Sequence, residues 1–391
     1  MKIFLINGIV IQYACLIKND FGKEIFMKCK KLLCVLCIWF VLFFVGSAFA
    51  STIQEKGKYA NLPGVQHLKK VKPNGDFMYV VKMGTLAPEG VGWAALIKEV
   101  VNPGILKVTN GLIYLDWYYG GTMGDDQDIL SKMRNNQLQG GGFSGQGMVL
   151  ACPEMALMEL PFLFENYEEV EYIYSKLRPR INQWFERHGY HLVLLAEQDF
   201  DQVYSTKIPI KTPDDFRNSR VLTWYGPLEE KVLRALSSSP IPIRVPEVAA
   251  SIRTGVCDAF ISPGIWAVGT QMYTVMKYIN PMHIRYSPAG GIVTMKTWNL
   301  LPKEIQNAVD DFVMSVEKDF RKKVRESNDK CLKAMYKYGM KEVKMTPAEI
   351  DILKKRLMPV WDEFAQRGYY SKIELEEVKA LLAEYRAKNK K

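Results

Sequence analysis

The spacing of apolar positions changes repeatedly along the chain and predicts strands and helices in turn. Residues 77–83 and 113–118 alternate and are rich in β-branched or aromatic side chains, as is typical of strands. Residues 125–138 instead place their apolar side chains on one helical face. Strands that alternate with helices indicate a parallel α/β architecture. A second run of such units at 208–261 predicts a second α/β lobe.

The longest predicted element lies towards the C-terminus. Between Pro302 and Gly339 there is no internal proline or glycine, and the apolar residues keep a 3.6-residue period. About 37 helical residues at about 1.5 Å each span roughly 55 Å, more than one small lobe. We expect this helix to bridge both lobes; a coiled-coil seam between two copies is the alternative. A helix at 93–106 should break or kink at Pro103.

The N-terminal region predicts export from the cytoplasm. A positive stretch at 27–31 precedes an uncharged apolar run at 32–45, and small residues follow at Ala48 and Ala50. These three features define a signal peptide, here residues 27–50, and predict a periplasmic protein. The apolar run is shorter than the roughly 20 residues of a membrane span. A retained N-terminal anchor is the competing interpretation.

The segments on either side of the signal peptide have their own interpretations. Residues 1–26 hold a second apolar stretch that does not fit the signal pattern. Our hypothesis is that translation starts at Met27 and that residues 1–26 are a mis-assigned start. Residues 51–77 are polar and basic and predict a lead-in to the first lobe.

Charge and chemistry then exclude several classes of protein. The net charge of +10 includes +4 in residues 1–50, and the remainder is spread thinly, so no nucleic-acid partner is expected. His188 and His191 lack an acid spaced for metal binding, so no metal is expected. The glycines at 140, 142 and 145 match a dinucleotide fingerprint. They follow a helix in an exported chain, which favours close packing of the backbone against a ligand or the second lobe over a cofactor.

No nucleophile and base are spaced for catalysis, so no catalytic residue and no enzyme activity are predicted. An exported two-lobe chain without catalytic parts indicates a binding protein whose lobes close on a ligand. Cys152, Cys257 and Cys331 are far apart and odd in number, so a single disulfide is left open.

Six segments, in order and at matching spacing, resemble the solute-binding proteins of TRAP transporters of the DctP type. The resemblance covers about residues 78–345. It rests on Thr85–Gly90, Gly120–Gln127, Leu160–Phe164, Pro209–Phe216, Thr254–Asp258 and Leu301–Gln306.

The resemblance implies a two-lobe periplasmic binding protein fold with a long C-terminal helix spanning both lobes. Lobe I would comprise residues 78–198 with 288–327, and lobe II residues 199–287 with 328–391, including the C-terminal helices. Such proteins capture a small solute and deliver it to a membrane permease of a small and a large subunit. A binding module that feeds a sensor, without transport, is the alternative. The resemblance leaves a homodimer open, and it implies no cofactor.

The chain departs from the family pattern at the residues that usually bind a carboxylate. Members of the family often carry an arginine at the position of Leu222; Arg220 lies two residues earlier, on the same face of a strand. Asp201 takes the place of a second arginine, and Ser262 that of an asparagine. These four residues are predicted ligand-site residues, and Arg220 is the candidate clamp.

Aromatic side chains complete the predicted ligand site. They are Trp224 and Trp266 in the second lobe and Trp93 and Phe143 in the first, beside Ser144. The predicted solute is therefore either carboxylate-type or larger and less acidic. Arg244 and Arg285 are reserve partners for an acidic ligand.

Overall fold

The computed structural model describes residues 79–224 and 226–389. The chain divides into two units, residues 1–66 and 67–391. All the elements below belong to the second unit, and it is there that both predicted lobes are found.

The predicted start at Met27, the signal peptide at 27–50 and the lead-in at 51–77 lie outside the described residues. Among the helices that are described, none combines the length and the apolar character needed to cross a bilayer.

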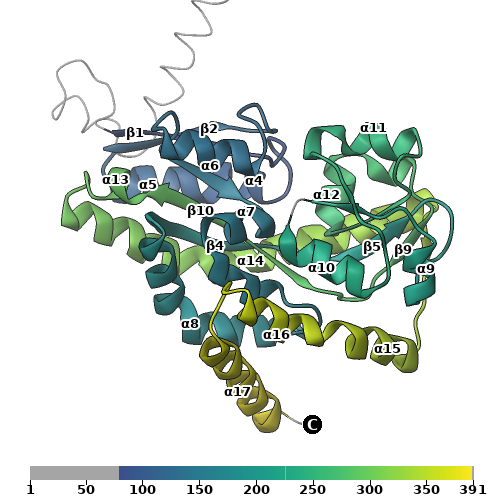
Figure 1. Cartoon of the computed structure of the whole chain (residues 1–391). Coiled ribbons are helices and arrows are strands. Elements are labelled where there is room, and N and C mark those ends of the chain that lie inside the picture. Colours follow the sequence, from purple (N-terminus) through teal and green to yellow (C-terminus); the bar gives the residue numbers. More distant parts are fainter. Residues whose placement is uncertain (1–78, 225, 390–391) are drawn as a thin grey trace, which may run out of the picture. The chain divides into compact units, whose positions relative to one another are not determined.

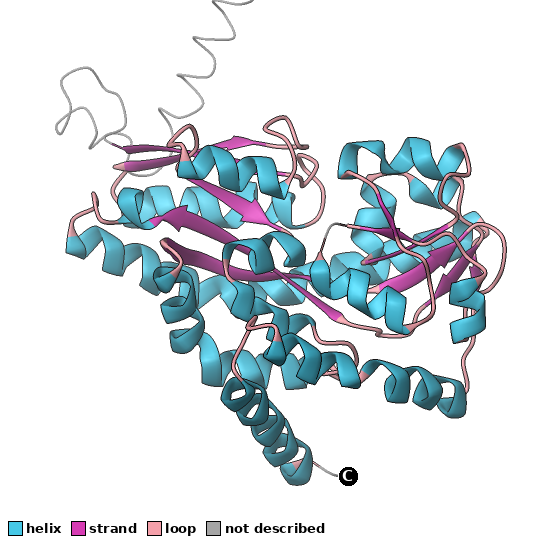
Figure 2. Cartoon of the chain, viewed as in Figure 1, coloured by secondary structure: helices cyan, strands magenta, loops and turns pink. Residues whose placement is uncertain are grey.

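Five strands form the first sheet, in the order β2-β1-β3-β10-β4. Figure 2 draws the strands in magenta and the helices beside them in cyan. Strand β1 pairs in parallel with β2 and β3, whereas β10 runs antiparallel to β3 and β4. The antiparallel β10 departs from the predicted parallel arrangement, because β10 follows β9 of the second sheet and enters without a helical crossover of its own. The strands are Tyr79–Thr85 (β1), Ile113–Tyr118 (β2), Gly140–Phe143 (β3), Tyr190–Phe200 (β4) and Tyr286–Thr294 (β10).

Helices pack on this sheet and form the first lobe with it. The helix expected to break or kink at Pro103 continues through it, as α4, a π-helical turn and α5. A π turn directly before a proline absorbs the irregularity that the missing N–H creates. The bounds are Trp93–Leu96 (α4), Ile97–Val101 (π turn), Asn102–Val108 (α5), Asp126–Arg134 (α6), Gly145–Ala151 (α7), Pro153–Glu159 (a 3-10 helix), Tyr167–Arg187 (α8) and Met295–Trp298 (α13).

A four-stranded sheet, in the order β11-β9-β5-β8, organises the second lobe. A short pair, β6 and β7, lies beside it through a bridge from Val221 to Ala259. The strands are Gln202–Ser205 (β5), Leu222–Thr223 (β6), Ile241–Pro242 (β7), Ala259–Ser262 (β8), Tyr278–Asn280 (β9) and Lys341–Glu342 (β11). The helices are Pro213–Arg217 (α9), Pro227–Ala235 (α10), Val248–Arg253 (α11) and Gly264–Gly269 (α12), with 3-10 turns at Val245–Glu247 and Met272–Thr274.

The predicted long helix is confirmed as α14, Lys303–Tyr338 (Figure 1). It begins after Pro302 and ends at Gly339, whose φ of 113° only glycine adopts readily. The helix contacts β4 and α5 of the first lobe and α12 of the second, as a bridging helix should. Buried Glu317 fixes it to the first lobe by accepting hydrogen bonds from Arg178 and from the backbone N–H of Leu195 (2.7 Å).

Three helices follow α14 and contact both lobes. They are Pro347–Leu357 (α15), Pro359–Gln366 (α16) and Lys372–Lys388 (α17). Helices α15 and α16 pack on α10, and α17 packs on α8. Trp184 of α8 donates a hydrogen bond to Glu374 of α17 (3.0 Å), and Arg386 pairs with buried Glu169 (2.7 Å). The C-terminal segment thus covers the first lobe as well as the second.

The glycines of β3 pack closely, as expected, but against β10 and Trp93 of the first lobe and not against the second lobe. A Cβ at Gly140 would lie 2.5 Å from the carbonyl oxygen of Ile292 in β10. A Cβ at Gly142 would lie 2.3 Å from the indole of Trp93. The first contact constrains the sheet, and the second lets Trp93 lie directly over the strand.

Replacing Gly140 by alanine is expected to lower the free energy of unfolding by about 1–3 kcal/mol, because the added methyl forces β3 away from β10. Urea unfolding measures the change. Gly291→Ala on β10 is the matched control, because its Cβ would meet only Leu194, at 3.6 Å. If both substitutions lower the free energy of unfolding equally, close packing at Gly140 does not explain the loss of stability.

Candidate functional site

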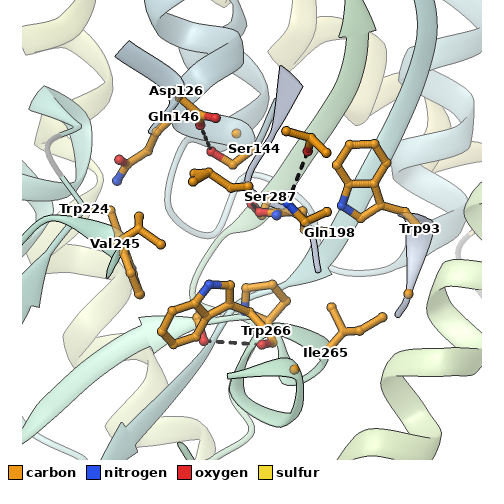
Figure 3. A pocket seen from close by; sticks show the side chains of 18 of the residues that line it. Trp93, Asp126, Ser144, Gln146, Gln198, Trp224, Val245, Ile265, Trp266 and Ser287 are labelled. Carbon is orange, nitrogen blue, oxygen red and sulfur yellow. Dashed lines mark hydrogen bonds between the residues drawn. The ribbon is translucent and has the colours of Figure 1, made fainter. Parts of the chain in front are cut away.

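A pocket lies between the first and second lobes and draws its lining from both (Figure 3). The β1–α4 loop, the N-terminal ends of α6 and α7, and the end of the first lobe's 3-10 helix bound it on one side. The end of β8 and helix α12 bound it on the other. The lining side chains used below are Trp93, Asp125, Asp126, Ser144, Gln146, Glu159, Gln198, Asp201, Trp224, Ser262, Trp266, Arg285 and Ser287.

Helix starts position the polar side chains of the first lobe. Asp125 caps α6 in a reciprocal capping box with Asp128. Ser144 caps α7 by accepting the backbone N–H of Gly147 (3.4 Å), and its hydroxyl donates a short hydrogen bond to Asp126. Both helices follow strands of the first sheet, so their N-terminal ends meet at the sheet edge where ligands of α/β folds usually bind.

Two tryptophans form the wall of the second lobe. Trp224 donates its indole N–H to the carbonyl of Ile261 (2.7 Å), which fixes the ring. Trp266, on α12, lies edge-on to Trp224, with ring centroids 4.5 Å apart and planes at 76°. Both rings are half-buried and present apolar surface to the pocket.

A buried ion-pair cluster lies where the two lobes join. Asp201 sits between β4 and β5, and Arg285 directly precedes β10; these are the segments that link the sheets. The Arg285 guanidinium donates to Asp201 (2.6 Å) and to Glu229 of α10 (3.2 Å). Glu229 also accepts the backbone N–H of Trp224 (2.7 Å), so one carboxylate orients both the guanidinium and the aromatic wall.

Burial controls the ionisation of this cluster. Burial raises the pKa of Asp201 and of Glu229, and the attraction of Arg285 only partly opposes it. Burial raises the pKa of Glu159 to about 8, with Arg285 opposing and the two carboxylates adding to the effect. Burial likewise raises the pKa of Asp126 to about 7 against its hydrogen bond from Ser144. Burial thus favours the protonated form of all four carboxyl groups.

Stability should fall as the pH rises from about 5 to 8, and Glu159 should contribute to the fall. Its folded pKa of about 8 lies above the ordinary 4.5, so the folded state binds the extra proton between these values. We expect Glu159→Gln to flatten the pH dependence by up to about 1.4 kcal/mol per pH unit. Urea unfolding at several pH values measures this. Glu168→Gln, at an exposed acid, is the control, and equal slopes for both variants would contradict the assignment.

Two contacts cross the pocket from one lobe to the other. Arg244 of the second lobe donates to Asp125 (2.8 Å) and Asp128 (2.5 Å) at the start of α6. Gln146 of α7 donates to Glu229 of α10 (3.1 Å). These contacts hold the lobes together at the rim and inside the pocket, respectively.

The structure brings six of the nine predicted site residues together in this pocket. They are Trp93, Ser144, Asp201, Trp224, Ser262 and Trp266. The other three are not among the lining residues.

Phe143 is fully buried in the first-lobe core, and Leu222 is fully buried in the core of the second lobe. Arg220 is half-exposed and pairs with Asp258 (3.1 Å). Of the two reserve arginines, Arg285 lines the pocket and Arg244 lies at its rim.

Of the lining side chains named above, six polar ones were not predicted from the sequence: Asp125, Asp126, Gln146, Glu159, Gln198 and Ser287. Glu159 directly precedes the Leu160–Phe164 segment that supports the family resemblance, but nothing in the segment marks the acid. Ser287 donates to Gln198 (3.2 Å) across β10 and β4, a pairing that sequence spacing does not indicate.

A metal site is not formed by the histidine pair. The Nε2 atom of His188 is hydrogen-bonded to the carboxylate of Glu154 (2.8 Å). His191 instead pairs with Asp310 (2.9 Å) and stacks on Trp298. Cys152 lies near Glu154 and His188, with candidate ligand atoms within 4.8 Å of one another, but Arg187 already pairs with that carboxylate (2.9 Å).

Cys152, Cys257 and Cys331 are all free thiols in the structure. The disulfide left open by the sequence is therefore not formed among the described residues.

Two α/β lobes, a bridging helix and a pocket between the lobes define a solute-binding protein of the two-lobe type. The family model of bacterial extracellular solute-binding proteins, family 7, also called DctP, matches residues 99–367. The chain belongs to this family, and the resemblance stated from its sequence motifs is confirmed.

Individual relatives are distant in sequence but share the fold. The 2,3-diketo-L-gulonate-binding periplasmic protein YiaO of Escherichia coli is 22% identical over 236 residues, which cover 60% of this chain and 72% of that protein. A TRAP periplasmic solute-binding protein of Haemophilus influenzae with bound L-gulonate superposes with a TM-score of 0.72 at 20% identity, over 78% of this chain and 99% of that one. One from Sulfitobacter with bound β-D-galacturonate gives 0.70 at 19%, over 78% and 99%.

Proposed function

We propose that this chain is the periplasmic solute-binding subunit of a TRAP-type secondary transporter. It captures a small organic solute between its lobes and delivers it to the small and large permease subunits. The observation that carries the proposal is the pocket lined from both lobes at their junction. The names of the relatives add support, since YiaO is named for binding 2,3-diketo-L-gulonate and the Haemophilus protein holds L-gulonate.

Each part of the pocket has a task in this function. The linking segments around Asp201 and Arg285 serve as the hinge, and α14 limits the movement to opening and closing. The tryptophans provide apolar area, and the carboxylates and Arg285 recognise the polar groups of the solute. The solute is either carboxylate-type, as in the relatives, or larger and less acidic.

The remaining expectations from the sequence belong to the same proposal. Export through the signal peptide at 27–50 brings the chain to the periplasm. The lobe boundaries stay at 78–198 with 288–327, and at 199–287 with 328–391, although α17 also covers the first lobe. A homodimer through the C-terminal helices is compatible with solute binding.

Native mass spectrometry of the chain purified from periplasm, without refolding, tests solute capture. We expect a mass shift that disappears on denaturation and an N-terminus after Ala50. Uptake by cells that lack the gene then tests transport of the solute so identified. If the chain binds a solute but cells that lack the gene take that solute up as fast as before, the transport role is contradicted and the sensor alternative is supported. If the purified chain shows no mass shift and binds no compound in a ligand screen, solute binding itself is contradicted.

A further inference from the structure

Carboxyl groups outnumber basic groups at the junction of the lobes. The buried carboxyl groups of Glu159, Asp201 and Glu229 all act electrostatically on Arg285. They come from the 3-10 helix at Pro153–Glu159, the β4–β5 link and α10, and none is more than 2% exposed. Three carboxyl groups therefore share one guanidinium in a place that water screens poorly.

No other basic side chain compensates for this excess. Arg285 is the one lysine or arginine among the described residues that line the pocket. Its Nε and Nη2 atoms are already bonded to Asp201 and Glu229. Arg244, at the rim, is bonded to Asp125 and Asp128.

Several carboxylate oxygens of the pocket also lack a hydrogen-bond donor. Within the described part of the chain, the Glu159 carboxyl group accepts no hydrogen bond, although the residue is 2% exposed and lines the pocket. One oxygen each of Asp126 and Asp201, Oδ1 in both cases, is buried without a partner. Buried acceptors without donors are costly, so such groups point to a donor that the protein itself does not supply.

We propose that the solute carries a protonated amine, which supplies a positive charge and the N–H donors that Glu159 and the Oδ1 atoms of Asp126 and Asp201 lack. The inference rests on the proposed function, because it names the class of solute held in the same pocket. An amine of this kind offers two or three N–H donors to these carboxylate oxygens.

The aromatic wall fits the same class of solute. Indole faces attract cations by about 0.5–2 kcal/mol, and Trp93, Trp224 and Trp266 line the pocket from both sides. The carbon stem of an organic amine would lie against these rings, with the ammonium group towards the carboxylates. A solute carboxylate would instead add a fourth carboxyl group around a guanidinium whose Nε and Nη2 atoms are already bonded to Asp201 and Glu229.

The proton on Glu159 provides a test, because a cluster with only a structural role would not release a proton when the solute binds. Glu159 is partly protonated near pH 7.5, because burial raises its pKa to about 8 while it faces Arg285, Asp201 and Glu229. An ammonium group that binds beside Glu159 favours the ionised carboxylate and expels this proton into the buffer. Binding of a carboxylate would do the opposite and retain or add a proton.

Four five-carbon probes of matched length test the inference: cadaverine, 5-aminopentanoate, glutarate and pentane-1,5-diol. L-Gulonate represents the acids held by relatives. Isothermal titration calorimetry at pH 7.5 in phosphate and in MOPS, neither of which is a primary amine, gives the affinity and the proton balance. We expect at least one amine to bind tenfold or more tightly than glutarate, the diol and L-gulonate, with proton release.

Glu159→Gln should weaken binding of the amine at least tenfold and abolish the proton release. Glu168→Gln, at an exposed acid outside the pocket, should leave both unchanged. The glutamine side chain keeps the shape of glutamate, and thermal unfolding confirms that the variant is folded before it is titrated.

Tighter binding of glutarate or L-gulonate than of both amines would overturn the inference and leave the proposed function standing. Amine binding that Glu159→Gln does not alter would overturn it as well. Binding of none of the five probes, together with an unshifted mass of the periplasmic protein, would contradict the amine and the proposed function alike.

Discussion

Arg285→Met is expected to lower the free energy of unfolding by about 3–5 kcal/mol at pH 8, because it leaves buried carboxylates without their counter-charge. Arg285 pairs with Asp201 and Glu229 where the lobes join. Burial alone would lower the pKa of Arg285, but the three surrounding carboxyl groups outweigh burial and raise this pKa above its usual value. The loss should be smaller at pH 5, where protonation can neutralise the carboxyl groups. Urea unfolding at both pH values measures it.

Arg234→Met is the matched control for this prediction. Arg234 pairs with Glu230 one helical turn away, but the side chain is 59% exposed. Exposed pairs of this kind contribute about 0–1 kcal/mol. Equal losses for Arg285→Met and Arg234→Met, or a loss at Arg285 that does not depend on pH, would show that the buried cluster is not held by its guanidinium.

Replacing Trp224 and Trp266 together by alanine is expected to weaken binding of the periplasmic solute roughly 100-fold or more. Buried tryptophans at the centre of a binding site each account for about 2 kcal/mol or more of the binding free energy. The two rings pack edge to face at 4.5 Å, so loss of one releases the other. Titration calorimetry with the solute identified by mass spectrometry gives the affinity of both proteins.

Trp361→Ala is the control that distinguishes loss of solute binding from loss of stability. Trp361, on α16, donates to the carbonyl of Pro161 (3.1 Å) and is not among the residues lining the pocket. This variant should lose stability but keep the affinity of the unaltered protein. Unchanged affinity in the Trp224 and Trp266 double variant would mean that the solute does not contact the aromatic wall.

The fold could be predicted where the evidence is local in the sequence. The long helix is marked by Pro302, Gly339 and an unbroken apolar period, and α14 begins and ends within one residue of those marks. A break or kink was predicted at Pro103; the helix instead continues through a π turn just before it, a form that the sequence does not show. The direction of β10 depends on the sheet from which it arrives, which no local pattern records.

Site residues could be predicted where they stand near the end of a strand or helix. They could not be predicted where their contacts join residues that are far apart in the sequence. Trp93, Trp224 and Trp266 stand at element ends and line the pocket. The expectation for Arg220 assumed a regular strand, but β6 covers only Leu222–Thr223, so alternation does not carry the side chain inward. The cluster around Arg285 joins residues 84 and 56 positions apart, which charge spacing cannot indicate.

The contact of Arg244 with Asp125 and Asp128 has a consequence for the timing of solute release. This contact is made between protein groups, so part of the free energy of closure is present before any solute arrives. A larger closed population without solute raises the apparent affinity and slows discharge. Because the Arg244 side chain is 49% exposed, salt screens the contact, and the lifetime of the loaded state shortens as ionic strength rises.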